Sequence, residues 1–409
     1  MIRSLLPLFL LCTQIASAQE FVIELDDHDP FANDSDLNRL DQYFDNVRLI
    51  GLGESTHGTH EFFTMRHRLI RYLSENHEFN TVFMEADFAN SLVIDEYIKG
   101  NGGTAEDAVK NLGLWPWITQ EMVDMVKWLK GYNESHPSNQ ISFVGADVQK
   151  FDVTVRRLEQ LVEKYNLTPR VNKNVDANAF YKLSKKEVLE LRSVEISWYN
   201  KLDTSNFLEK DQYEYRWLFR HLNQILSEKL EKKSNQTTYR DKMMAENILK
   251  HMAEKEESRG VFWAHNGHIA NLFSKKKHSG VAGGYLKKAL VDRYFILGQE
   301  FDQGTFNARV RPTDYINDSD WVLKEVEVGE SPAGSFAANL RMIRHPFVFM
   351  AIDELPAEET LYINSIGAIW YTNKEGEASE FLRKNHHGRK AFDGMILIKE
   401  STPTQMLDR

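Results

Sequence analysis

Short apolar runs, rich in β-branched and aromatic residues, recur along the chain between longer segments of helical periodicity. The early runs are almost continuously apolar, which is typical of strands buried on both faces of a sheet. Strands that alternate with helical connections predict an α/β fold with a mainly parallel sheet flanked by helices. The predicted strands span residues 47–53, 81–86, 141–147, 261–265, 294–301, 321–328, 347–352, 367–372 and 394–400.

Residues 152–259 show a different pattern, because charged residues are frequent and apolar residues recur at helical spacing. Within residues 206–233, apolar side chains return every three or four positions, as in an amphipathic helix. We therefore predict a helical lobe over about 152–259, inserted between two strands of the sheet. Its runs of charge are expected to form a solvated face rather than a binding tail.

The first 18 residues have the three parts of a secretory signal peptide. Arg3 supplies the positive start, Leu5–Leu11 form the apolar segment, and Ala16-Ser17-Ala18 offers a small-residue cleavage site. The apolar segment is too short to span a bilayer as a stable helix. We therefore expect cleavage near Ala18 and a mature chain of residues 19–409 that is secreted or periplasmic, with no stable membrane insertion.

The composition of the chain excludes several classes of function. Of the 409 residues, 42% are hydrophobic, which is ample for a large core. The single cysteine, Cys12, lies in the predicted signal peptide, so the mature chain would contain neither a disulfide nor a cysteine nucleophile. The net charge is −10 and no basic block stands out, so we expect no nucleic-acid partner. The sequence does not predict an oligomeric state.

Acidic and histidine side chains collect at the carboxyl ends of the predicted strands. In open parallel sheets, ligands bind beyond these ends. A helix cap or a turn would explain any one of these residues alone, but the repetition from strand to strand indicates a site. In chain order the residues are Glu54 and His57, Glu85 and Asp87, Asp147, His265 and His268, and Glu300.

The helix predicted after the first strand places one arginine among apolar side chains. At 100° per residue, Arg66 lies in the middle of the face that carries Phe62 and Leu69. A guanidinium that points inward needs carboxylate partners, and Glu54 and Glu85 are the nearest candidates. Three other polar residues are predicted to coat the outer surface of the helix: His60, His67 and Arg68. Glu61, in the first turn, is predicted to interact with the helix dipole.

The histidines suggest general base chemistry. His57 lies in a turn between Gly53 and Gly58, which can aim an imidazole over the end of the sheet. His265 and His268 would share one side of a helix that starts beside them. The sequence contains no G-x-S-x-G, H-E-x-x-H or phosphate-loop motif. A histidine oriented by a carboxylate would activate water, and a second histidine would assist the oxyanion or leaving group. A metal held by the same histidines and carboxylates is the main alternative.

Several of these residues occur in motifs whose combined order and spacing resemble the erythromycin esterase family. The first motif is 53-GESTHG-58, followed by Glu61-Phe62 and Arg66. The remaining matches cover most of the mature chain: 83-FMEA-86, the Trp-rich 114-LWPWITQEMVDMVKWLKGYN-133, 145-GAD-147, 264-AHNGH-268, 283-GGYL-286, 296-ILGQEFDQGTF-306 and 392-FDG-394.

The resemblance implies a bilobed α/β catalytic domain with a deep cleft. It also implies hydrolysis without a metal or cofactor, of a macrolide lactone in the best-known members. Position by position, His57 resembles the general base that activates water. The supporting positions are Glu54, Arg66, Glu85, His265 and His268. The less firmly matched candidates for supporting or substrate-binding roles are Asp147, Glu300, Glu121, Trp115 and Trp117, with core packing as the alternative for the two tryptophans.

These observations predict an exported hydrolase that cleaves a carboxylic ester or lactone of small size. A signal peptide separates this chain from cytoplasmic resistance enzymes, so a macrolide is only one candidate substrate. Two alternatives remain open at this stage. One is a metal-dependent hydrolase that uses the same cluster, and the other is a non-enzymatic binding protein associated with the cell envelope.

Overall fold

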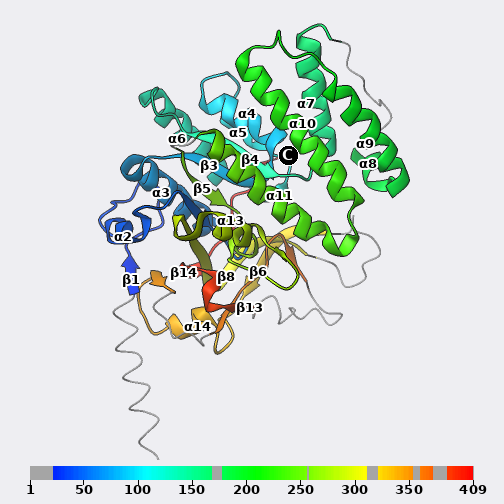
Figure 1. Ribbon diagram of the computed structural model, residues 1–409. Coiled ribbons are helices and arrows are strands. Elements are labelled where there is room, and N and C mark those ends of the chain that lie inside the picture. Colours follow the sequence, from blue (N-terminus) through cyan, green and yellow to red (C-terminus); the bar gives the residue numbers. More distant parts are fainter. Residues whose placement is uncertain are drawn as a thin grey trace, which may run out of the picture. The chain divides into compact units, whose positions relative to one another are not determined.

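The computed structural model describes residues 22–167, 177–255, 258–310, 321–352, 360–371 and 385–408 (Figure 1). The predicted signal peptide lies outside the described residues. The chain divides into two compact units. Unit 1 contains the residues up to 79, residues 264–272 and the residues from 287 onward, and unit 2 contains residues 80–263 and 273–286. Among the helices that the structure describes, none is both long and apolar enough to span a membrane.

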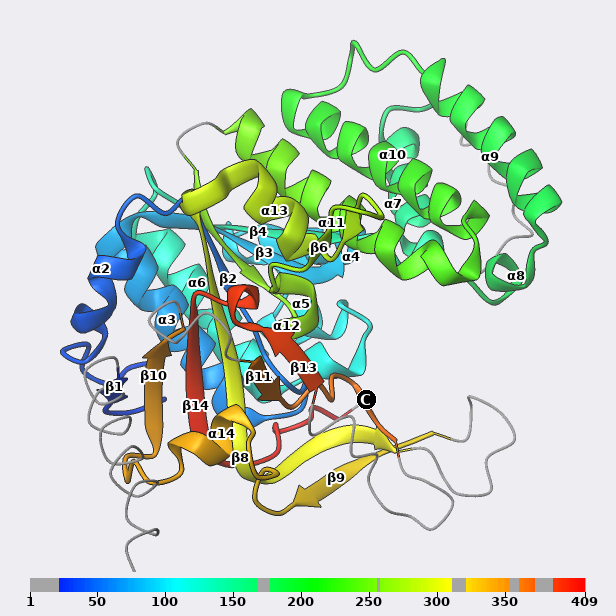
Figure 2. The same ribbon diagram turned by 60° about the horizontal axis from the view of Figure 1, so that its bottom comes forward.

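Unit 1 is built around one long strand, β8 (Tyr294–Val310), whose first nine residues are all buried. This burial agrees with the continuous apolar run in the sequence and with a strand covered on both faces. β8 pairs in parallel with β2 (Leu49–Leu52), β14 (Gly394–Ser401) and β12 (Ile369–Trp370), and antiparallel with β9 (Val322–Val328). Antiparallel pairing continues from β14 to β10 (Phe347–Ala351) and from β10 to β1 (Val22–Leu25), as Figure 2 shows.

The remaining elements of unit 1 are short, apart from one helix. α3 (His60–His77) follows the turn after β2, and Glu78 ends it in the left-handed conformation, at φ +57°. The other elements are η2 (Leu37–Leu40), α2 (Asp41–Phe44), α12 (Asn266–Ile269), η4 (Val291–Arg293), α14 (Phe336–Leu340), η6 (Arg389–Ala391) and the pair β11 (Thr360–Ile363) and β13 (Asn385–Gly388).

Unit 2 has its own strands, β5 (Arg259–Trp263), β3 (Phe79–Asp87) and β4 (Ser142–Asp147), in that order. β3 and β4 are parallel, with an irregular register between Met84 and Asp87. Gly145 permits the close approach, because a Cβ there would collide with the backbone of Ala86 and Asp87. The carboxyl ends of these two strands are therefore brought together. A small hairpin, β6 (Phe273–Ser274) and β7 (Ser279–Gly280), completes the strands of the unit.

Long helices make up most of unit 2. The stretch predicted as a helical lobe contains α7 (Phe151–Lys164), α8 (Ala177–Lys182), α9 (Lys185–Asn200), α10 (Glu209–Leu230) and α11 (Lys233–Glu254), as Figure 1 shows. In α10 the buried residues include Trp217, Leu218, Leu222 and Ile225, as its periodicity predicts. The unit also contains α4 (Phe88–Ile98), α5 (Ala105–Lys110), η3 (Trp115–Trp117), α6 (Gln120–Ser135) and the first part of α13 (Ala282–Leu290).

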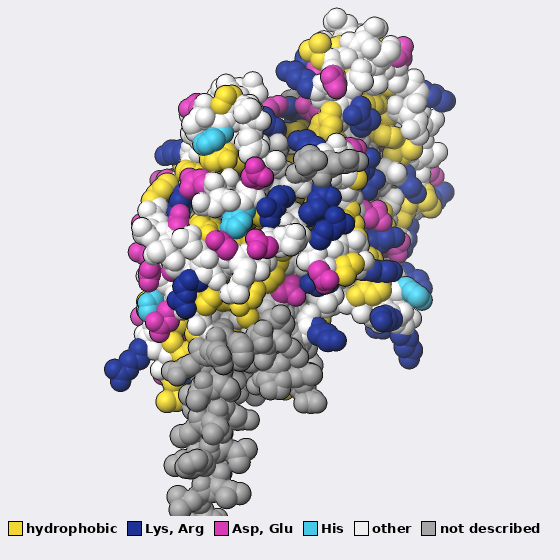
Figure 3. All heavy atoms as spheres, turned by 60° about the vertical axis from the view of Figure 1, so that its left-hand side comes forward, with side chains coloured by type: hydrophobic (Ala, Val, Ile, Leu, Met, Phe, Trp, Pro, Cys, Tyr) yellow, Lys and Arg dark blue, Asp and Glu magenta, His cyan; other side chains and the backbone are white. Residues whose placement is uncertain are grey.

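The prediction of an α/β fold is confirmed, with parallel central strands and flanking helices. Each of the nine predicted strands overlaps an observed one, although the boundaries differ and β8 extends nine residues beyond its predicted end, from 301 to 310. The deep cleft and the separate helical lobe stay predictions. On the face that Figure 3 shows, the lysine and arginine side chains are interspersed with aspartates and glutamates.

Candidate functional site

The first cluster of site residues lies in unit 1, where the chain leaves β2. Glu54 is fully buried, and its two carboxylate oxygens bind different partners. One oxygen, Oε1, contacts Nδ1 of His57, and the other, Oε2, accepts a hydrogen bond from Nη2 of Arg66. Arg66 is fully buried on α3, and His57 is 8% exposed. The predicted inward direction of Arg66 and its pairing with Glu54 are therefore observed.

The electrostatics of this cluster keep Glu54 ionised. Burial by itself raises the pKa of the Glu54 carboxyl, but Arg66 and His57 outweigh it, and the pKa lies below its ordinary value. An ionised Glu54 that contacts Nδ1 of His57 favours the tautomer with the proton on that nitrogen. In this tautomer Nε2 carries the lone pair, so the imidazole is equipped to accept a proton at Nε2.

The turn that carries His57 is held by a second segment that sequence reasoning missed. The backbone N–H of His57 donates to the carbonyl of Gly367 over 3.1 Å, and the N–H of Gly367 donates to the carbonyl of Ser55 over 3.0 Å. Gly367 has φ +61°, and a Cβ there would touch the rings of both His57 and His265. The left-handed backbone therefore favours a glycine at this position. In the sequence, Gly367 is only the first residue of a predicted strand, and nothing around it indicates a contact with His57.

His265 lies beside His57, with 5.6 Å between the ring centroids. It caps α12, because its Nδ1 accepts a hydrogen bond from the N–H of Gly267 over 3.1 Å. The other ring nitrogen, Nε2, lies 3.3 Å from the carbonyl oxygen of Ser55. Together these contacts assign the proton of a neutral His265 to Nε2. His268 is partly exposed, and its ring centroid lies 6.4 Å from that of His265.

Glu300, on β8, also belongs to unit 1 and is buried. Its Oε2 accepts the backbone N–H of Asn364 over 2.6 Å, and its Oε1 accepts the side-chain amide of Asn364 over 2.6 Å and the N–H of Phe301 over 2.8 Å. The hydroxyl of Ser55 lies 3.4 Å from the same Oε1. The carboxylate thus ties the segment of Asn364 to the turn before His57.

The second cluster lies in unit 2, at the carboxyl ends of β3 and β4. Arg240, from α11, donates from Nε and Nη2 to the two oxygens of Asp147 over 2.8 and 2.6 Å. Its Nη2 also donates to Oε1 of Glu85 over 2.7 Å. Burial opposes the charge, but Asp147 and Glu85 raise the pKa of Arg240 well above its ordinary value. Sequence reasoning missed Arg240, which lies in a charged helix far from both carboxylates along the chain.

Asp87 lies beside this ion-pair cluster and is buried. Its Oδ1 accepts two backbone hydrogen bonds, from the N–H groups of Gln149 and Lys150 over 2.6 and 2.7 Å. Burial, followed by the negative charge of Asp147, raises the pKa of Asp87, and these causes exceed the opposing effect of the two hydrogen bonds. Asp147 is paired with Arg240, so of these two neighbouring carboxylates Asp87 is the one that tends to keep its proton.

A family comparison agrees with the motifs quoted above. The model of the erythromycin esterase family matches residues 74–401, which is most of the chain. The chain belongs to the erythromycin esterase family. YbfO of Bacillus subtilis (strain 168), provisionally named a hydrolase, is 24% identical over 417 aligned positions, covering 92% of this chain and 89% of YbfO.

Two solved structures share the fold of this family member. A Bacillus cereus protein has a TM-score of 0.79 at 22% identity, covering 97% of this chain and 99% of its own. A mutant of the erythromycin esterase EreC in its open conformation has a TM-score of 0.63 at 14% identity, covering 92% of this chain and 96% of its own. At these identities the likeness concerns the fold alone.

The remaining candidate site residues of this erythromycin esterase family member lie in unit 2. Glu121 is buried in the first turn of α6. Trp115 and Trp117 form the short helix η3 and are 7% and 2% exposed. Trp117 packs edge-on against Trp263, with 6.1 Å between ring centroids. Both tryptophans are thus packed among other side chains.

The prediction that His67 and Arg68 coat the outer surface of α3 is wrong, because both are buried. Arg68 donates to both carboxylate oxygens of Asp36 over 2.9 and 2.6 Å and to the carbonyl of Asp27 over 2.7 Å. Burial lowers the pKa of His67 to about 3. Helical periodicity identifies the apolar face, but it does not show that the N-terminal segment packs against the polar one.

Glu61 and His60 are the other two residues of α3 whose positions were predicted from the sequence. Glu61 lies in the first turn of α3, as predicted, and it also has a second role. Its carboxylate accepts the backbone N–H and the hydroxyl of Thr402 over 2.8 and 2.6 Å, and so anchors the C-terminal segment. His60 is partly buried, with its ring centroid 5.7 Å from that of His28. Among the residues described by the structure, no group of three or more His, Cys, Asp or Glu side chains has the arrangement of a metal site.

Proposed function

We propose that this erythromycin esterase family hydrolase cleaves a carboxylic ester or lactone with His57 as the general base. The observation that carries the proposal is the buried chain of contacts from Arg66 through Glu54 to Nδ1 of His57. This arrangement suits general base catalysis, because a carboxylate holds the base in one tautomer. Arg66 keeps that carboxylate charged.

In the proposed reaction, Nε2 of His57 removes a proton from water as the oxygen of that water attacks the ester carbonyl. The carbonyl double bond opens to a tetrahedral oxyanion, and the imidazolium is stabilised by the negative charge of Glu54. The oxyanion then collapses and breaks the bond to the alkoxide, which takes the proton back from His57. The products are a carboxylic acid and an alcohol, or a single hydroxy acid from a lactone. No protein nucleophile is needed, which suits a chain without a nucleophile motif.

The family supports the reaction class, and the geometry supports the choice of His57 over His265 as the base. His265 already accepts a hydrogen bond at Nδ1 from its own helix, and its Nε2 faces a carbonyl oxygen. A proton on Nε2 that is directed to a carbonyl makes that nitrogen a donor. We therefore assign His265 to donating a proton or a hydrogen bond, and His57 to accepting one.

The proposal includes export, which rests on the signal peptide pattern of residues 1–18. Mass analysis of the protein from the culture medium or periplasm tests it directly. The expected mature N-terminus follows Ala18, and a full-length chain found only in the cytoplasm would contradict export. The substrate would then be an ester or lactone that the protein meets outside the cytoplasm.

The hydrolase assignment is tested by screening wild type and the His57→Ala variant against a panel of esters and lactones that includes macrolides. His136→Ala is the matched control, because His136 is exposed at the end of α6. We expect at least one substrate to be turned over by wild type and by the control, but not by His57→Ala. Equal turnover by His57→Ala would refute the general base. Repeating the screen after exhaustive chelation tests the metal-dependent alternative, which predicts loss of activity.

A further inference from the structure

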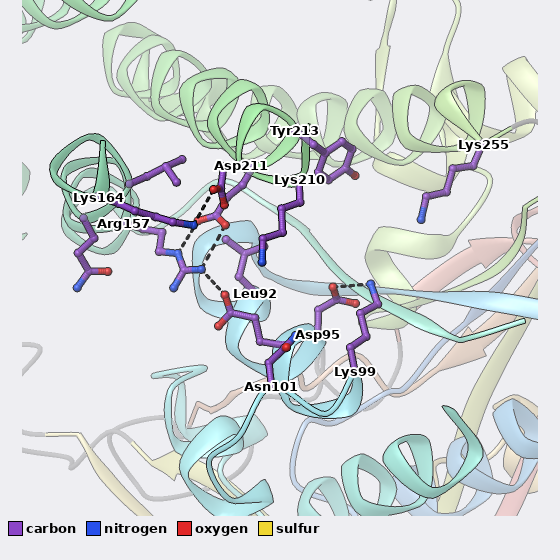
Figure 4. Close-up of a pocket in the computed structure, with 14 residues that line it drawn as sticks. Leu92, Asp95, Lys99, Asn101, Arg157, Lys164, Lys210, Asp211, Tyr213 and Lys255 are labelled. Atoms are coloured by element: carbon purple, nitrogen blue, oxygen red, sulfur yellow. Dashed lines mark hydrogen bonds and ion pairs between the residues drawn. The ribbon is translucent and has the colours of Figure 1, made fainter. Parts of the chain in front are cut away.

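A pocket of about 710 Å³ lies within unit 2, lined by α4, α7, α10 and the residue that follows α11. This volume is within the range of about 300–1,000 Å³ that is usual for small-molecule sites. None of the candidate catalytic residues lines it. Figure 4 shows that charged side chains of both signs extend into it from several helices.

The carboxylates of the pocket all have cationic partners. Lys99 binds Asp95 over 2.7 Å, Lys164 binds Asp211 over 2.6 Å, and Arg157 binds both Glu96 and Glu214. Two further lysines, Lys210 and Lys255, extend into the same space (Figure 4). No carboxylate of the described residues forms an ion pair with either one. Within the described part of the chain, the pocket therefore combines neutralised acids with two lysines, Lys210 and Lys255, that have no ion-paired carboxylate.

Two ammonium groups converge at one end of this pocket. Nζ of Lys99 and Nζ of Lys255 each lie 3.4 Å from the hydroxyl oxygen of Ser142. Burial and the neighbouring charge of Lys99 lower the pKa of Lys255, and these causes exceed the opposing effect of Asp95 and Glu254. Each lysine follows the C-terminus of a helix, where the dipole favours a cation. The helix dipole explains why each lysine alone is found at a helix C-terminus. It does not explain why the two ammonium groups contact the same hydroxyl. Asp95 balances one of the two charges, and a bound anion would balance the second and accept hydrogen bonds from both ammonium groups.

The rest of the pocket is suited to a polar ligand body. Asn101 and Gln160 contribute side-chain amides. The hydroxyl of Tyr213, another lining residue, lies 3.0 Å from Nδ1 of His251. The volume exceeds that of a bare inorganic anion, so there is room for a body that carries hydroxyl groups.

We propose that this pocket binds a small organic phosphate or sulfate monoester, with the dianionic group between the ammonium groups of Lys99 and Lys255. The hydroxyl oxygen of Ser142, which both ammonium groups contact, holds them near each other. The hydroxylated body extends along the wall formed by α7 and α10. This site is independent of the proposed esterase activity, and its occupancy can be measured without an enzymatic assay.

Isothermal titration of the whole protein with glucose 6-phosphate, glucose 6-sulfate and glucose tests the proposal. Wild type is expected to bind one or both anions and to bind glucose far more weakly. A preference between the two anions identifies which group the pocket takes. Lys255→Ala should weaken binding roughly tenfold or more, as expected for the loss of a hydrogen bond to a charged group. Lys255→Arg, which keeps the charge, should retain most of the affinity.

Lys242→Ala is the matched control, because Lys242 lies on α11, pairs with Glu246 over 3.6 Å and does not line the pocket. Its affinity for both anions should equal that of wild type. Equal binding of the anions to Lys255→Ala and wild type would overturn the proposal. So would equal binding of glucose and its phosphate, or no binding of either anion at concentrations of roughly 10 mM.

Discussion

Glu54 holds His57 at Nδ1 and leaves Nε2 as the basic nitrogen of the ring. The same carboxylate binds the guanidinium of Arg66 through its other oxygen. A single buried glutamate thus connects the arginine that fixes its charge with the histidine that would use it. The roles of the three residues are separable by mutation, because each contributes a different property to the cluster.

Glu54→Gln should impair turnover more than substrate binding. The amide keeps the size of the side chain but removes the charge that orients His57 and stabilises its protonated form. We expect kcat to fall roughly 10²-fold or more, with a smaller change in KM. Steady-state kinetics on a substrate from the screen measures both. Glu75→Gln is the control, because Glu75 pairs with Arg71 at the exposed end of the same helix, and a similar loss of kcat in that variant would contradict a specific role for Glu54.

Arg66→Ala should destabilise the fold, because it leaves the Glu54 charge buried without its guanidinium. Breaking a buried ion pair in this way costs about 3–5 kcal/mol in the free energy of unfolding. Urea unfolding measures the change. Adding Glu54→Gln to Arg66→Ala should recover part of the loss, since the unpaired charge is then gone. Arg156→Ala provides a surface comparison, as its pair with Asp152 is exposed and should change stability by about 0.5 kcal/mol or less.

Local patterns predicted the elements and much of the first cluster. The apolar runs marked the strands, the Gly-bracketed turn marked His57, and the phase of α3 placed Arg66 inward. What the sequence did not predict depends on contacts between distant segments. Arg68 is buried by residues near Asp36, and Gly367 reaches the turn of His57 from a segment about 310 positions away. Periodicity reports which face of an element is apolar, but not which segment covers its polar face.

Arg240 is the clearest case of a residue that only the fold reveals. It lies 155 positions from Glu85 and 93 from Asp147, and it binds both. Arg240→Gln should lower the free energy of unfolding by about 3–5 kcal/mol, because Asp147 is buried and would lose its cation. Urea unfolding measures this loss. Arg220→Gln is the matched control on α10, because its pair with Glu246 is partly exposed, and an equal loss in the two variants would contradict a special role for Arg240.

Asp87→Asn should stabilise the protein at neutral pH but not under acid conditions. The pKa of Asp87 is raised from 3.8 to about 7, chiefly by burial and then by Asp147. Between about pH 4 and 7 the unfolded chain releases this proton while the folded chain retains it. The contribution of Asp87 to stability is therefore fully present below its unfolded pKa and decreases as pH rises towards the folded pKa.

Asparagine mimics the neutral side chain and keeps an oxygen that can accept the hydrogen bonds from Gln149 and Lys150. The stability difference between Asp87→Asn and wild type should therefore be smallest near pH 4. It should grow to about 1 kcal/mol or more in favour of the variant near pH 8, since each unit of pKa shift corresponds to about 1.4 kcal/mol. Urea unfolding at a series of pH values measures the difference, and the exposed Asp45→Asn serves as the control. Parallel curves for wild type and Asp87→Asn would show that Asp87 does not hold a proton in the folded state. The Asp87 carboxyl could then not donate a proton at the ends of β3 and β4.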